Sequence, residues 1–226
     1  MARTESSATA TGRPDSVDLR NQERGATPAP AVAPPEALAI IADPAPLGLA
    51  AFAMTTFVLS VFNAGIISDA KLEGVVLPLA LFYGGLGQLL AGMWEFRKAN
   101  TFGALAFTSF GAFWLSFAAY VKFVAPTLPT TDVNKATGLY LLAWTIFTAY
   151  MTIAAMRVNL AVLGVFVALT LTFLALTIGE LSTTTSITKL GGWLGLITAV
   201  IAWYASFAGV TNATWRRTVV PVWPRA

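Results

Sequence analysis

The chain has 226 residues, of which 56% are hydrophobic and only 11% charged, and its formal net charge is +3. A soluble domain carries roughly twice that charged fraction. The composition therefore indicates a membrane protein, and it gives no reason to expect a nucleic-acid partner. The chain contains no cysteine and no histidine, which excludes thiol nucleophiles, thiolate metal sites and histidine proton relays. No metal, nucleotide or redox motif is present, so we expect neither a cofactor nor an enzyme.

The first 40 residues differ from the rest of the chain. They are rich in Ala, Thr, Pro, Ser and charged residues and show no apolar period, which predicts a disordered N-terminal tail. No apolar segment follows the early arginines closely, so we do not expect this tail to act as a signal peptide. We predict a membrane domain over residues 41–215 and a short C-terminal tail over residues 216–226.

Six apolar runs follow the tail. Each is close to the roughly 20 residues that a helix needs to cross the hydrocarbon core of a bilayer. None shows the alternation of a membrane β-barrel, and a helix satisfies its own backbone polar groups in lipid. The sequence therefore predicts an all-α polytopic membrane protein with six transmembrane helices. We place them at 47–66, 74–94, 102–124, 138–156, 159–179 and 191–211.

The basic residues between the runs predict the orientation. An even number of spans puts both termini on one side of the membrane, and the positive-inside rule makes the more basic side cytoplasmic. We therefore expect both termini in the cytoplasm, with the protein in a plasma or inner membrane. The termini side collects Arg3, Arg13, Arg20, Arg24, Arg97, Lys98, Arg157, Arg216, Arg217 and Arg225, and the other side has Lys71, Lys122, Lys135 and Lys189.

The first run opens with a helix-start signal. Asp43 precedes Pro44, and an aspartate can accept hydrogen bonds from the free N–H groups of a first turn, where proline is tolerated. A ligand contact by the same carboxylate is the alternative. Capping is the commoner role, and we expect Asp43 to cap the helix.

Three spaced blocks of sequence carry a family resemblance. Together they resemble the acetate uptake transporter family, the bacterial succinate–acetate permeases and their fungal relatives, over roughly residues 43–222. The family signature Asn-Pro-Ala-Pro-Leu-Gly-Leu is matched here except that Asp43 replaces the Asn. The further matching residues are Phe52-Ala53-Met54-Thr55-Thr56, Asn63, Phe82-Tyr83-Gly84-Gly85, Gln88, Ala91-Gly92, Glu95, Asn100-Thr101-Phe102-Gly103, Ala106-Phe107-Thr108-Ser109-Phe110-Gly111 and Phe113-Trp114.

The resemblance implies a six-helix protomer with its own pore, assembled as a homo-oligomer, a hexamer, that passes acetate and also succinate. It further implies a narrow hydrophobic constriction, which falls here on Phe52, Phe110 and Leu169. Phe110 departs from the family pattern, since it lacks the hydroxyl of the tyrosine found there. Ala202 corresponds to another pore-lining position, where the size of the side chain affects which acids fit.

Polar residues follow helical spacing on three runs. In lipid such a face meets a water-filled path or another helix, and threonines also bond their own backbone, which is the commoner role for any single Thr. For Asn63 and Gln88, both pore lining and helix–helix hydrogen bonding remain open. The stripes are Phe52, Thr56, Ser60 and Asn63; Thr145, Thr148 and Thr152; and Thr170, Phe173, Thr177 and Glu180.

The placement of charge limits the mechanism. The spans contain no Lys or Arg except Lys122 near one end, so a crossing carboxylate meets no buried cation. Either polar donors replace its hydration shell, or the protonated acid crosses. Glu95 and Glu180 are the candidate proton sites. Their commoner role is solvation at the interface or, for Glu95, pairing with Arg97 or Lys98.

Three functional hypotheses follow. The first is a proton-linked acetate permease or an acetate channel, with Asn63, Gln88 and Thr56 contacting the carboxylate. The second is a passive channel for neutral solutes such as urea, short amides or undissociated acids. The third is a non-transporting sensor or scaffold with the N-terminal tail as its output, which retained uptake after deletion of residues 1–40 would contradict.

Overall fold

The computed structural model describes residues 41–69 and 71–225. Within these residues, six helices are long and apolar enough to cross a membrane, and no β-strand is formed. The prediction of an all-α, six-span membrane protein is thus confirmed. The predicted disordered tail, residues 1–40, lies outside the described residues.

Some of the six spans are interrupted by changes of helix type, so that one span comprises several elements. The second span begins as 3₁₀-helix, passes through a long π-helical segment and ends as α-helix. The elements are α2 (Ala45–Asn63); η1 (Leu72–Val75), α3 (Val76–Pro78), η2 (Leu79–Gly87) and α4 (Gln88–Arg97); α5 (Thr101–Ala119), η3 (Tyr120–Val124) and η4 (Ala125–Thr127); α6 (Val133–Ala155); α7 (Leu160–Leu181); and α8 (Thr185–Trp215).

Helix ends follow local capping chemistry more closely than hydropathy. α2 ends at Asn63, before the predicted residue 66, because Gly65 takes a left-handed conformation with φ 74°. The side-chain oxygens of Asn100 and Asn159 cap α5 and α7 by accepting the N–H of the third residue beyond each. α8 extends beyond the predicted run at both ends, because its flanking polar residues form helix outside the hydrocarbon core as readily as within it.

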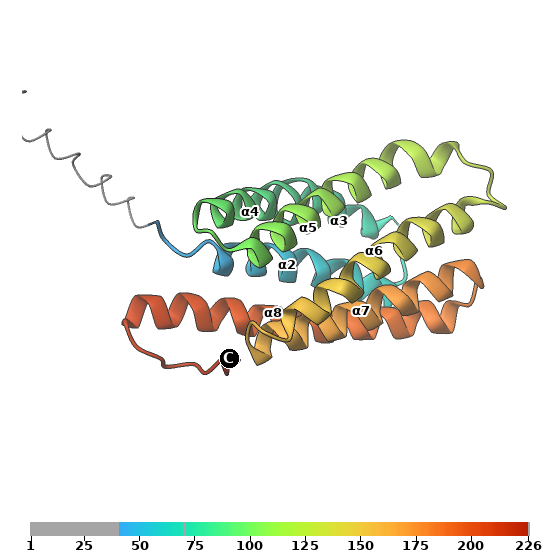
Figure 1. Cartoon of the computed structure of the whole chain (residues 1–226). Helices are drawn as coiled ribbons and strands as arrows, with labels where there is room; N and C mark the ends of the chain where they lie inside the picture. The colour runs from blue at the N-terminus through green and yellow to red at the C-terminus, as the bar shows by residue number, and fades with distance from the viewer. Residues whose placement is uncertain (1–40, 70, 226) are drawn as a thin grey trace, which may run out of the picture. The chain divides into compact units, whose positions relative to one another are not determined.

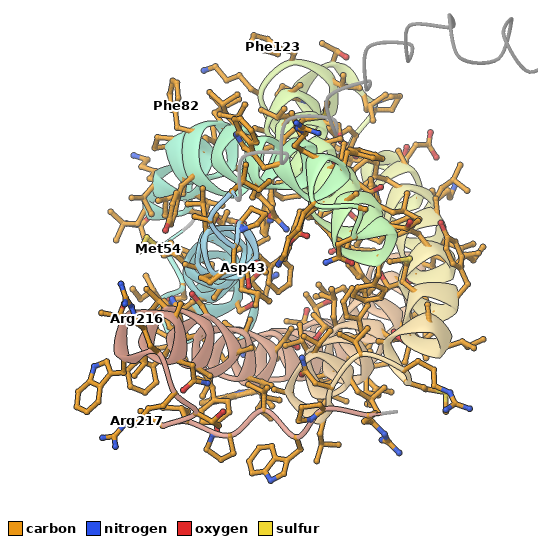
Figure 2. All side chains as sticks on the ribbon, turned by 60° about the vertical axis from the view of Figure 1, so that its left-hand side comes forward. Asp43, Met54, Phe82, Phe123, Arg216 and Arg217 are labelled. Atoms are coloured by element: carbon orange, nitrogen blue, oxygen red, sulfur yellow. The ribbon has the colours of Figure 1, made fainter. Side chains whose placement is uncertain are left out.

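The spans lie roughly parallel to one another (Figure 1), and the turned view of Figure 2 shows them arranged as a closed ring. α6 packs on α7, α7 on α8 and α8 on α2, while η2 and α4 connect α2 to α5. α5 and α6 make little backbone contact, and aromatic side chains close the ring between them. The rings of Phe113 and Trp144 lie 5.1 Å apart, and Tyr120 stacks on Tyr140 at 5.7 Å.

Two glycines let neighbouring helices touch backbone to backbone. A Cβ at Gly192 of α8 would collide with the backbone nitrogen of Ala64, just after α2. A Cβ at Gly111 of α5 would lie 2.6 Å from the backbone nitrogen of Leu89 in α4. Small residues at such crossings are a common way for membrane helices to gain packing contacts.

Threonine hydroxyls join α6, α7 and α8. Thr145 lies 3.1 Å from the Thr177 hydroxyl, and Thr152 lies 2.8 Å from that of Thr170. Three of these four threonines also bond their own helix backbone, so they take the packing roles that the sequence favoured for single threonines, whereas Phe173 and Glu180 of the fifth-span stripe line a cavity described below. A similar contact of 3.3 Å joins Thr172 and Thr198 between α7 and α8.

The outer surface of the ring is apolar. Figure 2 shows Met54, Phe82 and Phe123 projecting away from the bundle, and Phe82 and Phe123 are 69% and 71% exposed. Large apolar side chains cover this face on every span, which suits contact with lipid chains. The chain is a multi-pass membrane protein.

Candidate functional site

Two cavities enter the ring of helices from opposite ends. The proximal cavity, of about 280 Å³, lies at the end where both termini of the described domain are found, and Asp43 and Val222 line it. The distal cavity, of about 240 Å³, is lined by Asn63, Glu73 and Glu180 among others. Phe52 and Leu169 line both cavities, so the two hollows approach each other across these side chains.

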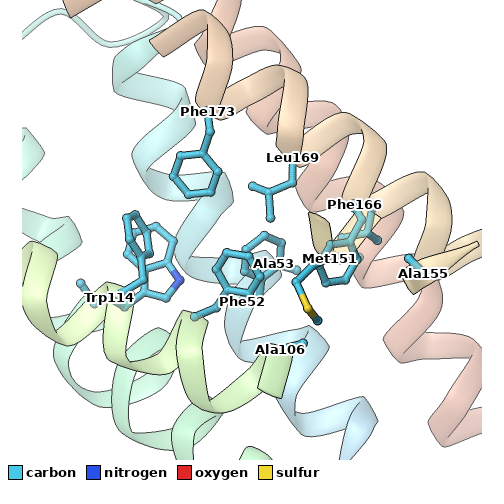
Figure 3. Close-up of a cluster of buried hydrophobic side chains, with 14 of the residues drawn as sticks. Phe52, Ala53, Ala106, Trp114, Met151, Ala155, Phe166, Leu169 and Phe173 are labelled. Carbon is cyan, nitrogen blue, oxygen red and sulfur yellow. The ribbon is translucent and has the colours of Figure 1, made fainter. Parts of the chain in front are cut away.

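An apolar partition, which we define as Phe52, Phe110 and Leu169, separates the cavities. All three side chains are 3–5% exposed, and the rings of Phe52 and Phe110 lie 5.9 Å apart. Figure 3 shows Phe52 of α2 and Leu169 of α7 facing each other inside the buried cluster. Phe110 lines the proximal cavity, and its ring also stacks on Phe173 at 6.4 Å. The three residues expected at the constriction thus belong to one buried cluster and all line the proximal cavity.

Ala202 is placed differently from the other pore residues expected. It is fully buried in the apolar cluster and lines neither of the two cavities. Ala205 and Gly209, farther along α8, line the proximal cavity instead. Ala202 shares this packed cluster with Phe52, Phe110 and Leu169, and its expected effect on which acids fit stays a prediction.

The proximal cavity has an amide-rich wall. Gln88 is 1% exposed and lines it, and among the described residues its Oε1 has no hydrogen-bond partner. Asn100, Asn159 and Asn212 also line this cavity. A buried amide without partners costs a few kcal/mol unless water or a ligand satisfies it. Of the two roles considered for Gln88, the geometry favours the one at the cavity wall.

The distal cavity holds two hydroxyl or N–H groups without a partner in the described part of the chain. They are the hydroxyl of Thr56 and the indole Nε1 of Trp114, on side chains 6% and 2% exposed. The neighbouring Thr55, by contrast, donates to the Ala51 carbonyl at 3.0 Å. Both unpaired groups can donate a hydrogen bond, so the wall of this cavity suits an acceptor such as a carboxylate.

The sequence did not single out Trp114, which it placed in the core or an interface belt. Trp114 follows Phe110 by one helical turn and so shares its face. That spacing was the available signal. Asn63 lines the distal cavity, which agrees with one of the two roles left open for it, and its side chain is half-buried.

Two carboxylates line the distal cavity. Glu180 was expected from the sequence as a proton site, whereas Glu73 was missed. The second span was predicted to begin at residue 74, yet it begins at Leu72 and includes Glu73 in its first turn. An acidic residue in the first turn of a helix is stabilised by the positive end of the helix dipole. Glu73 was therefore a signal that the second span begins before residue 74.

Glu95 lies deeper than predicted. It is 0% exposed, and Asn100 Nδ2 donates to its Oε2 at 2.8 Å, while its Oε1 has no partner in the described residues. This buried position does not fit solvation at the interface, and the carboxyl group bonds Asn100 rather than forming an ion pair with Lys98, although Lys98 lies near enough to interact with it electrostatically. Lys98 instead forms an ion pair with Asp43 at 2.7 Å. Glu95 lines neither cavity, but its partner Asn100 lines the proximal one.

Asp43 satisfies one free N–H group at the start of α2, although Pro44 and not Asp43 holds the N-cap position, and Asp43 also lines the proximal cavity. Its Oδ1 accepts the backbone N–H of Ala45 at 3.1 Å and the ammonium of Lys98. The start of α2 lies beside the proximal cavity, so Asp43 is placed at the wall of this cavity, and a ligand contact by its carboxylate stays a prediction.

Residues 217–225, the C-terminal strap, fold back across the proximal end. The carbonyl oxygens of Val222 and Trp223 accept the N–H of Leu160 at 3.1 and 3.0 Å, which satisfies the free first turn of α7. Asn212 of α8 bonds the backbone of the strap three times, at 2.7 to 2.9 Å. The segment predicted as a short tail is therefore part of the wall of the proximal cavity.

Comparison with known proteins gives one family. The model described as the GPR1/FUN34/yaaH family matches residues 25–225. The succinate-acetate/proton symporter SatP of Escherichia coli is 40% identical over 184 residues, which cover 80% of this chain and 95% of SatP. The solved structure titled "Structure of the bacterial acetate channel SatP" superposes with a TM-score of 0.75 at 38% identity, covering 81% of this chain and 99% of that one.

Fungal relatives are longer than this chain. The accumulation of dyads protein 2 and the ammonia transport outward protein 2 of Saccharomyces cerevisiae are 46% and 42% identical to it, over 76% and 82% of its length. The matched regions span 62% and 66% of those two proteins, so the chain corresponds to about two thirds of each.

Proposed function

The chain belongs to the GPR1/FUN34/yaaH family, and we propose that it transports acetate, and with it succinate or other small carboxylic acids, across a membrane. One observation carries the proposal. Two cavities enter the bundle from opposite ends and meet at Phe52 and Leu169, and buried polar groups without partners line both. The names of relatives, a succinate-acetate/proton symporter and an acetate permease of Emericella nidulans, support the choice of substrate.

The polar groups suit a carboxylate on either side of the partition. In the proximal cavity, the Gln88 amide can donate through its nitrogen to a carboxylate oxygen. In the distal cavity, the Thr56 hydroxyl and the Trp114 indole supply two donors, and Asn63 adds an amide nearer the mouth. The substrate thus exchanges its water shell for fixed donors before and after the partition, which lowers the cost of desolvation.

The partition itself offers no polar group. Phe52, Phe110 and Leu169 surround the crossing point with aromatic and aliphatic carbon, so a bare anion there pays a desolvation penalty of several kcal/mol. A carboxylic acid that carries its proton pays much less. We therefore propose that the crossing species is the protonated acid, or that the anion and a proton cross together.

Carboxyl groups near the path supply the candidate proton sites. Glu180 and Glu73 line the distal cavity, where no Lys or Arg of the described residues joins them. Glu95 is fully buried beside Asn100 at the proximal end and lines neither cavity. The two acids that line the distal cavity repel an unprotonated substrate and can pass a proton to it, and they are therefore better placed for this role than Glu95.

A passive path for neutral solutes is the second candidate. The same partition that penalises an anion admits an uncharged molecule, and the one lysine facing a cavity among the described residues, Lys98, is already paired with Asp43. A relative named for outward ammonia transport adds weight to this candidate. Uptake that follows the concentration of undissociated acid and ignores membrane potential would favour it.

The orientation and assembly remain predictions. Arg97, Lys98 and Arg157 lie at the proximal end together with Arg216 and Arg217, which favours a cytoplasmic proximal cavity in a plasma or inner membrane. The family resemblance suggests a hexamer. Labelling of single cysteines placed at each end in intact cells would test the orientation, and mass measurement in nanodiscs would test the assembly.

Uptake of radiolabelled acetate into proteoliposomes tests the function. We expect uptake above that of protein-free liposomes, and concentration of acetate when an inward proton gradient is imposed. Equilibration without concentration would indicate a channel, and no uptake above the control would contradict acetate transport. The double variant Gln88→Leu/Thr56→Val should lose most of the uptake. Met54→Leu on the lipid-facing side of α2 should keep it.

A further inference from the structure

Asp43 and Lys98 form an ion pair at the entrance to the proximal cavity. The Lys98 ammonium lies 2.7 Å from Oδ1 of Asp43, and the two side chains are 38% and 44% exposed. Both residues line the proximal cavity, at the start of α2 and just after the end of α4. The pair therefore lies in contact with both the surrounding water and the cavity.

The pair is the main charge feature of the route. Among the described residues that line either cavity, Lys98 is the one cation, and Asp43 is the one acid that lines the proximal cavity. Because the two charges lie in contact, an anion that enters this cavity meets a cation whose field is largely cancelled. Asp43 takes one of the three N–H donors of the Lys98 ammonium, so a substrate carboxylate that binds Lys98 does so beside the Asp43 carboxylate and against its repulsion.

The hydrogen-bond geometry shows what the Asp43 charge adds beyond a cap. The same oxygen, Oδ1, accepts both the Ala45 N–H and the Lys98 ammonium. An asparagine oxygen can make both bonds without a negative charge. The cap and the link to Lys98 therefore need only an oxygen acceptor, and the negative charge affects mainly the electrostatics of the cavity.

We propose that Asp43 is a specificity-determining residue that competes with the substrate carboxylate for Lys98 at the proximal entrance. The inference rests on the proposed transport of small carboxylic acids. Exchange of one carboxylate for another on a half-exposed lysine is close to balanced in free energy, because such pairs are weak. Asp43 thus keeps the affinity of the proximal cavity for a monocarboxylate anion low, and Lys98 is the group that receives the anion.

Neutral replacements of Asp43 test this competition. We expect D43N to bind acetate about three- to tenfold more tightly than the wild type, since it removes one unit of repulsive charge next to Lys98. The gain should shrink at high ionic strength, because salt screens partly exposed charges. K98Q should bind acetate more weakly, and K98R, which keeps the cation, should stay within about twofold of the wild type.

Acetate binding is measured by line broadening of ¹³C-labelled acetate with the detergent-solubilised full chain, at low and high salt, and uptake is measured in proteoliposomes. D43S provides a second neutral variant that can still cap α2, should D43N fold poorly. Unchanged or weaker acetate binding in both neutral variants would overturn the proposal, as would an equal gain at both salt concentrations. Absence of wild-type uptake with the binding pattern intact would instead contradict the transport function alone.

Discussion

Leu169 offers a direct test of the partition. It is 3% exposed, lines both cavities and faces Phe52 across the crossing point. Leu169→Ala removes the volume of roughly three carbon atoms where the cavities of about 280 and 240 Å³ approach each other. One methylene in a tight apolar site changes discrimination by about 1–3 kcal/mol. We therefore expect propionate uptake relative to acetate to rise by about tenfold.

The assay is competitive uptake of differently labelled acetate and propionate into the same proteoliposomes. Leu171→Ala is the matched control, because Leu171 lies on the same helix but is 46% exposed on the outer face. Thermal unfolding in detergent checks that both variants fold, and Leu169→Val serves if Leu169→Ala does not. A folded Leu169→Ala protein with the same acid preference as Leu171→Ala would refute the assignment of the partition.

Three further predictions concern other parts of the bundle. Trp114→Phe removes an unpaired donor from the distal cavity and should raise the half-saturation for acetate about five- to tenfold in uptake assays, since such a bond contributes about 1 kcal/mol; an unchanged value would exclude a contact with substrate. Gly192→Ala should destabilise the protein by about 1–3 kcal/mol in thermal unfolding, because the new Cβ meets the Ala64 backbone. In the control Gly164→Ala the new Cβ makes only ordinary contacts, so the stability should change little. Asn212→Ala removes three bonds to the C-terminal strap and should raise its hydrogen exchange and proteolysis; equal protection in the variant would show that the strap is held by its other contacts.

The number and type of spans could be predicted from sequence because lipid leaves few alternatives. A run of about 20 apolar residues has to satisfy its backbone internally, and only a helix does so within one segment. The ends were less certain. Gly65 ends α2 early because of its backbone conformation, and the second span begins early because it includes Glu73 as a polar first-turn residue. Hydropathy measures neither effect.

The wall of the path was only partly predictable, because it depends on how far each helix is rotated. Thr56 and Gln88 could be named as candidate pore residues from the sequence, because a polar side chain within an apolar run is unusual whichever way it points. In the sequence Trp114 resembles any aromatic residue of a membrane helix, and only the packing shows that it lines the distal cavity and that its indole nitrogen has no partner among the described residues. Glu95 lies at a span end in sequence, yet the contact of α4 with α5 places its carboxyl group under Asn100, out of water.

The π-helical segment η2 has a consequence for how related chains diverge. At Gly85 a Cβ would collide with the carbonyl oxygen of Ala80, so the wide turn depends on a residue without a side chain. Such a turn accommodates one extra residue, and in an α-helix one residue corresponds to a rotation of about 100°. Loss of a single residue here would keep the span apolar and helical but would turn Gln88 away from the proximal cavity. Insertions and deletions in this short stretch therefore change the chemistry of the path while leaving the hydropathy of the protein almost unaltered.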